Sequence, residues 1–364
     1  MNVFNRSIAA GCAWLAAALA LPAWAEAPTG ASVATSTGGQ LAVQVNDDRM
    51  TISVAKVPQV YLYGPIDAGA AQRVEAMIQS HKIPAGSDIY LNSPGGDANA
   101  GMALGRLFRA NNIGTHLGSP RRVAGQPVMS KESQCVDACA YAYVGGLYRW
   151  SASGADRFGG QPVAGTGASA PAIHDYLKEM GINPLVFGNA STNGTVTWLD
   201  GDLMLGYGVA NNGRLPPKAV NQPVNGIASL SLTQTTRDGE HSLTMMCRND
   251  GMTVTATYTI GADHAKQIAA RATQYYFEID HQPATERQRA SVSAVGQSVV
   301  FTQPFTEAQL QQLTTARSIS AYLSDKGGAV RYGFWMELDP VRNELLTYTR
   351  GCQQIAKAMA AQPH

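Results

Sequence analysis

Apolar residues in the first part of the chain fall into short runs that alternate with segments of helical periodicity. Runs at 60–66 and 89–92 each precede a segment with apolar residues three or four positions apart, at 70–80 and 99–111. Strands that alternate with helices in this way form a parallel sheet with helices packed on it. The first part of the chain is therefore predicted to be an α/β domain.

The pattern changes after residue 226 to single alternation of apolar and polar residues, which is typical of antiparallel strands. Asp238-Gly239 and Asp250-Gly251 separate three such runs, and Asp-Gly favours tight hairpins. We therefore expect a smaller α+β domain with an antiparallel sheet. Its further predicted elements are helices at 263–274 and 306–315, strands at 275–279, 291–301 and 329–338, and a terminal helix at 340–360.

Proline and polar residues concentrate at 215–224, between the two patterns. Such a segment is typical of a linker between domains. We accordingly expect the α/β domain to cover 41–222 and the α+β domain to cover 226–364. Alternating residues at 41–54 predict a hairpin that turns at Asn46-Asp47-Asp48.

The amino terminus has the pattern of a cleaved secretory signal. Arg6 precedes an apolar run at 8–21, and Ala23-Trp24-Ala25 supplies the small residues of a cleavage site. Residues 1–25 are thus predicted to be a signal peptide, and the protein is expected to be periplasmic or secreted. Residues 26–40 are rich in Ala, Gly, Ser and Thr, and we expect them to be a flexible leader.

Charge and hydropathy exclude several classes of partner. The chain has 27 basic and 26 acidic residues, so loss of Arg6 with the signal leaves a formally neutral protein. Neutrality argues against nucleic acid as a partner. After the signal, the chain lacks the roughly 18 consecutive apolar residues that a membrane-spanning helix needs. We therefore expect neither a nucleic-acid partner nor a membrane span after cleavage.

Four cysteines remain once Cys12 is lost with the signal, and an even number in an exported protein indicates disulfides. Pairing within each region is the simplest of the three connectivities, and it joins Cys135 to Cys139 and Cys247 to Cys352. A metal site or free thiols are the alternatives. Because the histidines have no Cys/His ligand spacing, we expect no metal, and no pattern predicts a cofactor.

Two segments have the pattern of a reactive site. The segment Leu91-Asn92-Ser93-Pro94-Gly95-Gly96 runs from a strand through a glycine turn into a helix, which leaves backbone N–H groups free to hold an anionic oxygen. Later, Asp137 begins a helix of small residues that ends at Gly145-Gly146. A nucleophile would stand at the position of Asp137, although an acid there is also a favourable helix cap.

Over about 57–212, these segments resemble the proteolytic subunit of the Clp protease and the wider Clp/crotonase superfamily. The similarity is greatest to exported, Clp-protease-like bacterial proteins with a Cys-x-Ser-Ala-Cys motif. The resemblance implies a superhelical domain of repeated β-β-α units and assembly into a homo-oligomer. It also implies that Gly95 and Gly96 form an oxyanion turn.

The resemblance further implies that the catalytic apparatus is degenerate. The family serine lies nine positions before the closing glycine, and counting back from Gly146 gives Asp137. The family histidine precedes Gln-Pro, and Gly160 stands at that place before Gln161-Pro162. The family acid would fall near Val196, whose neighbours Thr195 and Thr197 are not acids either.

Three functions follow as hypotheses. The first is a non-catalytic binding or assembly module for a protein or peptide ligand, because both nucleophile and base are replaced. The second is a hydrolase-like enzyme in which Asp137 acts as acid or base beside the glycine turn. The third is a peptidase with displaced residues, which would be a serine among Ser133, Ser151 and Ser153 acting with His116 or His174.

Overall fold

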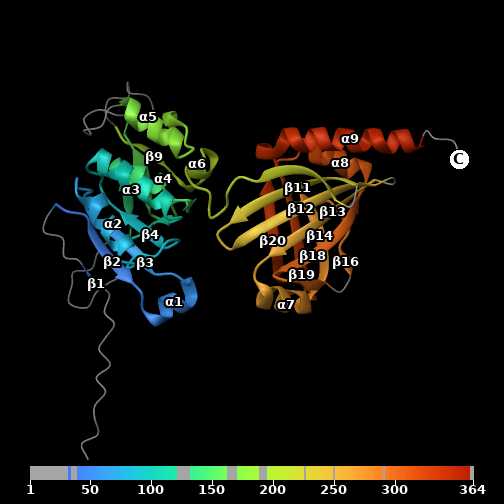
Figure 1. The fold of residues 1–364 in the computed structure, drawn as a ribbon, viewed down its shortest axis with the longest axis horizontal. Coiled ribbons are helices and arrows are strands. Elements are labelled where there is room, and N and C mark those ends of the chain that lie inside the picture. The colour runs from blue at the N-terminus through green and yellow to red at the C-terminus, as the bar shows by residue number, and fades with distance from the viewer. Residues whose placement is uncertain are drawn as a thin grey trace, which may run out of the picture.

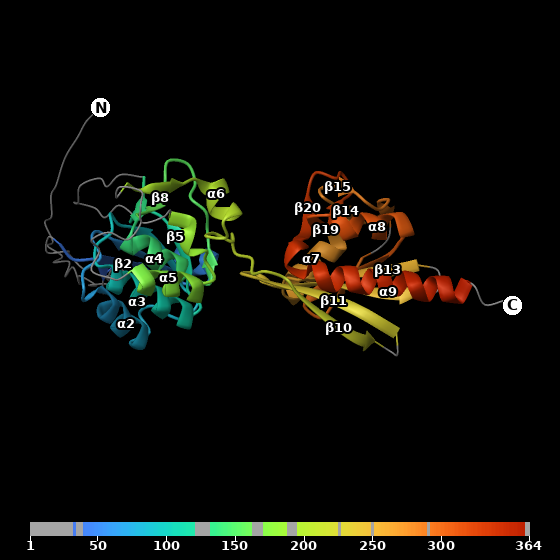
Figure 2. The ribbon, with the colours of Figure 1, turned by 90° about the horizontal axis from the view of Figure 1, so that it is seen from above.

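The computed structural model describes residues 32–33, 39–120, 132–161, 170–187, 195–224, 227–248, 251–289 and 292–360. Helices pack on several sheets, so the chain is a mixed α/β protein (Figure 1). Buried apolar residues form two clusters without a common member, one from Leu41 to Ala210 and one from Leu230 to Cys352. Figures 1 and 2 show the chain as two bodies, and the elements of each body carry one cluster; we call them the first and the second body.

The main sheet of the first body has the strand order β1-β2-β3-β4-β5-β7. The pairs β3–β4, β4–β5 and β5–β7 are parallel, as the alternation of strands and helices predicted. Its strands are β1 (Ser32–Val33), β2 (Ala42–Asn46), β3 (Gln59–Tyr63), β4 (Asp88–Asn92), β5 (Gly114–Leu117) and β7 (Tyr148–Arg149). A smaller sheet contains β6 (Gln134–Val136), β8 (Arg157–Gly160) and β9 (Thr197–Leu199).

Helices of the first body connect these strands and carry the reactive-site segments. They are α1 (Arg49–Ala55), α2 (Ala70–Gln79), α3 (Ala98–Ala110), α4 (Ala138–Val144), α5 (Ala170–Glu179) and α6 (Gly201–Gly206), with a 3₁₀ turn at Pro184–Phe187. Helix α3 begins at Asp97, whose carboxylate accepts a bond from Ala100 N at 2.8 Å. A side chain at Gly101 or Gly105 would collide with the backbone of α4. Glycine there lets the two helices touch, which fixes the start of α4 beside the glycine turn.

The second body contains two antiparallel sheets and a long terminal helix. One sheet has the order β10-β11-β12-β13-β18-β17, and the other has the order β15-β14-β19-β20 with β16 beside β14. The first comprises β10 (Lys218–Val224), β11 (Ile227–Thr236), β12 (Gly239–Arg248), β13 (Gly251–Thr259), β17 (Ser293–Val295) and β18 (Ser298–Phe305). The second comprises β14 (Ala272–Ile279), β15 (Gln282–Pro283), β16 (Gln288–Arg289), β19 (Ser318–Asp325) and β20 (Arg331–Glu337). The helices are α7 (Ala262–Arg271), α8 (Glu307–Thr315) and α9 (Arg342–Ala360), with a 3₁₀ turn at Asp339–Val341.

Three sequence expectations about these elements are wrong. The hairpin at 41–54 is instead β2 followed by α1, because Asp48 caps that helix by accepting a bond from Thr51 N at 3.0 Å. The expected linker at 215–224 is largely β10, an edge strand in which Pro223 lacks only an N–H. The single strand at 291–301 is the hairpin of β17 and β18.

Two predicted segments lie wholly or partly outside the described residues. These are the signal peptide at 1–25 and most of the leader at 26–40, in which Ser32 and Val33 pair with β2. In the described part of the chain, no helix combines the length and apolar character of a membrane span.

Candidate functional site

Asp137 lies at the sharp turn between β6 and α4 and has a strained backbone, with φ 53° and ψ −113°. A positive φ is unfavourable for any residue with a Cβ, and such strain persists where the surrounding fold enforces it. The carboxylate does not cap α4, so the capping interpretation is wrong. Asp137 Oδ1 instead accepts a hydrogen bond from Gln161 N at 2.8 Å.

A disulfide spans this turn. Cys135 on β6 is bonded to Cys139 in the first turn of α4, and their Cα atoms are 5.1 Å apart. The second bridge joins Cys247 to Cys352, so both predicted pairings are confirmed. The first bridge ties the strand before Asp137 to the helix after it, which restricts how far the strained turn can relax. Among the described residues, no group of three or more His, Cys, Asp or Glu could hold a metal ion.

The glycine turn lies against Asp137. A Cβ on Gly95 would be 3.4 Å from Asp137 Cβ, and one on Gly96 would collide with the backbone of Ile66. Both glycines have positive φ, at 108° and 140°. Gly95 N already donates to Ser93 Oγ at 3.2 Å. Among the described residues, the N–H groups of Gly96 and Ala138 have no partner, so these two are the candidate oxyanion donors.

Aromatic side chains fill the place where the resemblance would put a histidine. A Cβ on Gly160 would lie 2.6 Å from Cδ1 and Cγ of Phe187, whose side chain is buried. The Phe187 ring also packs against Tyr141 and Phe158, with centroid distances of 6.4 and 6.0 Å. A histidine at Gly160 therefore requires Phe187 to move.

The other sequence candidates are not assembled with Asp137. His116 lies on β5 between the rings of Tyr90 and Trp150, with its Nε2 3.6 Å from Asp88 Oδ1. His174 is half-buried on α5. Ser133 Oγ donates to Asp156 Oδ1 at 2.5 Å. Within the described residues, no hydrogen bond joins a histidine to Asp137 or to the three serine candidates. Thr195 and Val196 precede β9, which Thr197 begins. The basic residues Arg121, Arg122 and Lys131 lie outside the described residues.

Sequence reasoning missed Phe187, Gln161 and Ala138 as parts of this site. Ala138 could have been found, because it follows the nucleophile position at a helix start. Nothing in the local sequence marks Phe187, since it reaches Gly160 only through the packing of a distant turn.

Asp137→Asn is expected to stabilise the folded protein at neutral pH. Burial raises the pKa of Asp137 above 3.8, against the opposing effect of the Gln161 hydrogen bond. A raised pKa in the fold favours the protonated form. The stability that the protonated Asp137 carboxyl contributes is fully present at pH values below its pKa in the unfolded chain. It is lost as the pH rises through its pKa in the folded protein. Asparagine keeps an oxygen for Gln161 N, so a gain of about 0.5–1 kcal/mol is expected at pH 7.

Urea denaturation of both proteins at pH 7 and at about pH 3.5, below the ordinary pKa of aspartate, checks this. The gain should shrink at the lower pH, where the wild-type carboxyl is protonated. A difference that is equal at both pH values would contradict the assigned cause.

Gly160→Ala is expected to destabilise the protein by about 1–3 kcal/mol, the usual effect of overpacking. Its Cβ would press on the Phe187 ring. Thermal unfolding should show the loss, and adding Phe187→Leu should recover part of it. Gly206→Ala is a matched control, because a Cβ there meets no atom within 4 Å. If Gly160→Ala lowers the stability equally with phenylalanine and with leucine at position 187, the contact does not cause the loss.

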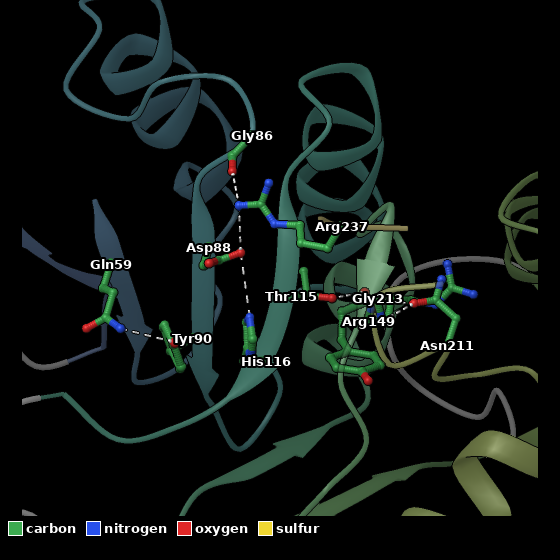
Figure 3. Close-up of polar contacts among 11 residues, drawn as sticks. Gln59, Gly86, Asp88, Tyr90, Thr115, His116, Arg149, Asn211, Gly213 and Arg237 are labelled. Carbon is green, nitrogen blue, oxygen red and sulfur yellow. Dashed lines mark hydrogen bonds and ion pairs between the residues drawn. The ribbon is translucent and has the colours of Figure 1, made fainter. Parts of the chain in front are cut away.

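Contacts between the two bodies centre on Arg237, in the turn between β11 and β12. Its Nη2 donates to Gly86 O at 2.7 Å and lies 3.3 Å from Asp88 Oδ1 (Figure 3). Burial would raise the pKa of Asp88, but His116 and Arg237 hold it below its ordinary value. Tyr148 OH also donates to Thr236 O, at 3.2 Å. Polar bonds thus join the two bodies beside β4 and β7.

Comparison with known proteins gives only distant likenesses. Neither protein-family models nor curated proteins match the chain. Among solved structures, the 1510-N membrane-bound stomatin-specific protease is 17% identical, with coverage of 46% of this chain and 87% of that one, at a TM-score of 0.30. ClpP1 from Listeria monocytogenes is 16% identical, with coverage of 42% and 88%, at 0.31. Invasion associated protein b from Bartonella henselae is 8% identical, with coverage of 38% and 96%, at 0.29. Likenesses this small carry no conclusion about ligand or reaction.

Proposed function

We propose that the chain is an exported, Clp-protease-like protein that binds a protein or peptide ligand at the Asp137 site without cleaving it. Support for the fold comes from the parallel pairing of β3, β4, β5 and β7, and from the glycine turn that meets the start of α4. The observation that carries the function is the Phe187 ring against Gly160, because it fills the place of a general base. A carboxylate without a neighbouring imidazole does not perform the serine reaction.

The polar groups of the site suit a peptide bond. The N–H groups of Gly96 and Ala138 can donate to a carbonyl oxygen. The Asp137 carboxylate, with Oδ1 bonded to Gln161 N, retains acceptor capacity for a peptide N–H. A ligand backbone supplies both partners, whereas a free carboxylate would meet the charge of Asp137. The ligand is therefore a peptide segment or an exposed loop of a protein.

Export and a two-domain organisation belong to the same proposal. Both bodies contain a disulfide, and disulfides persist mainly in oxidising compartments. Each body has its own buried cluster, which favours one domain ending near Gly213 and a second beginning at Lys218. Assembly into a homo-oligomer remains a prediction of the family resemblance.

A fluorophosphonate probe directed at reactive serines is expected to leave the folded protein unlabelled, because no histidine among the described residues is bonded to a candidate serine. Mass spectrometry of the intact protein measures the label, and an active serine hydrolase in the same tube is the positive control. Stoichiometric labelling that disappears on Ser133→Ala, Ser151→Ala or Ser153→Ala would overturn the proposal in favour of the peptidase hypothesis.

Proton transfer by Asp137 is the second candidate, and one observation favours it. Burial raises the pKa of this carboxyl, which suits an acid or base catalyst. Hydrolysis of p-nitrophenyl acetate by the pure protein distinguishes the two functions. Turnover that is abolished in Asp137→Asn would establish the enzyme, and equal background rates in both proteins would exclude this reaction.

A further inference from the structure

A pocket of about 360 Å³ lies at the junction of the two bodies, away from Asp137. Trp150 lines it from the first body, and Tyr258, Phe334 and Trp335 line it from the second. Arg237, whose bonds to the first body are drawn in Figure 3, is part of the same wall. Pockets between domains that combine aromatic walls with a few polar groups are frequent binding sites for small ligands.

Arg214 is the pocket arginine that forms no direct ion pair among the described residues. Its guanidinium lies over the ring of Trp335, 4.5 Å from the ring centre. Burial lowers the pKa of Arg214, which reflects poor solvation of its charge. Among the described residues, Arg214 forms no ion pair within 4.0 Å, although the charge of Glu337 acts on it, whereas Arg237 is paired with Asp88. A carboxylate entering the pocket could pair with Arg214 directly, because guanidinium binds carboxylate in a bidentate geometry.

An acidic group accompanies this cation. Asp238 also lines the pocket. The charge of Asp238 raises the pKa of His241 and that of Arg214 lowers it. His241 itself is 5% exposed, stacks on Phe334, lies tilted against Tyr258, and has its pKa lowered mainly by burial. The pocket lining thus includes Arg214 without a direct ion pair, the acid Asp238 and aromatic rings.

We propose that this pocket binds an aromatic side chain whose own backbone carries a free carboxylate and an N–H donor. Arg214 pairs with the carboxylate, Asp238 accepts from the amino or amide nitrogen, and the ligand ring lies among Trp150, Tyr258 and Trp335. A free aromatic amino acid and the carboxy-terminal aromatic residue of a peptide share this chemistry. The site is independent of the function proposed for Asp137.

Isothermal titration of the mature protein with three probes tests this. L-phenylalanine and N-acetyl-L-phenylalanine both carry the carboxylate, and L-phenylalaninamide lacks it. Binding of the first two, at least tenfold tighter than that of the amide, is expected. Stronger binding of L-phenylalanine than of its acetyl form assigns the site to free amino acids, and the reverse order assigns it to peptide ends.

Two arginine variants complete the test, one in the pocket and one on the surface as its control. Arg214→Gln should weaken L-phenylalanine binding at least tenfold, while Arg350→Gln on the exposed face of α9 should leave it unchanged. Circular dichroism confirms that both variants fold, and an unfolded Arg214→Gln is replaced by Arg214→Lys, expected to bind more weakly. Absence of heat at millimolar probe, equal binding of the amide, or full affinity in a folded Arg214→Gln would each overturn the proposal.

Discussion

Replacing both Cys247 and Cys352 by alanine is expected to lower the free energy of unfolding of the second body by about 4–5 kcal/mol. The bridge ties β12 to α9 across a sequence separation of 105 residues. In the chain-entropy model, closing a loop of about that length lowers the entropy of the unfolded chain, which raises its free energy by about 4.7 kcal/mol at 25 °C. Tyr348 on α9 would still donate to Met245 O at 2.9 Å, so the helix keeps one polar anchor.

Differential scanning calorimetry measures this loss and tests the two-domain proposal at once. If the bodies are domains, the midpoint temperature of unfolding of the second body should fall, while that of the first body should stay unchanged. The double variant Cys135→Ala/Cys139→Ala is the matched control, because its separation of 4 residues predicts a loss of about 2 kcal/mol, in the first body. A single transition that shifts equally in both variants would contradict the division.

Arg149→Met is expected to destabilise the first body by about 3 kcal/mol, since it removes three hydrogen bonds to backbone carbonyls at about 1 kcal/mol each. Arg149 is buried, and its guanidinium donates to Gly146 O at 3.0 Å, Gly208 O at 3.0 Å and Val209 O at 2.6 Å. Burial lowers its pKa to about 10, so the side chain stays charged at neutral pH. The residue therefore joins the end of α4 to the segment after α6.

Urea denaturation measures the effect, with Arg106→Met as the control. Arg106 pairs with Glu179 at 2.8 Å on the surface, where both side chains are about half exposed. An exposed pair contributes about 0–1 kcal/mol, so the control should change little. Similar losses in the two variants would show that the carbonyl bonds of Arg149 do not stabilise the fold.

Most of the secondary structure could be predicted from the sequence because local periodicity records it. Alternation of runs and helical segments identified β3, α2, β4 and α3, and the Asp-Gly dipeptides marked the turns around β12. Predictions failed where a residue type is equally compatible with two kinds of local structure. Asp48 favours a turn and a helix cap equally, and Pro223 is compatible with both a linker and an edge strand.

The sequence alone determined that residue 137 is an aspartate and residue 160 a glycine, and their reading as replacements of a serine and a histidine remains a prediction of the family resemblance. It also predicted the disulfide pairing as the simplest of three connectivities, and the structure confirms that pairing. Only the tertiary structure decided that Phe187 covers Gly160, that Asp137 bonds to Gln161 and does not cap α4, and that Arg214 faces a pocket. These contacts join segments from tens of residues to more than a hundred residues apart, and the packing of whole elements sets them, so local patterns do not record them.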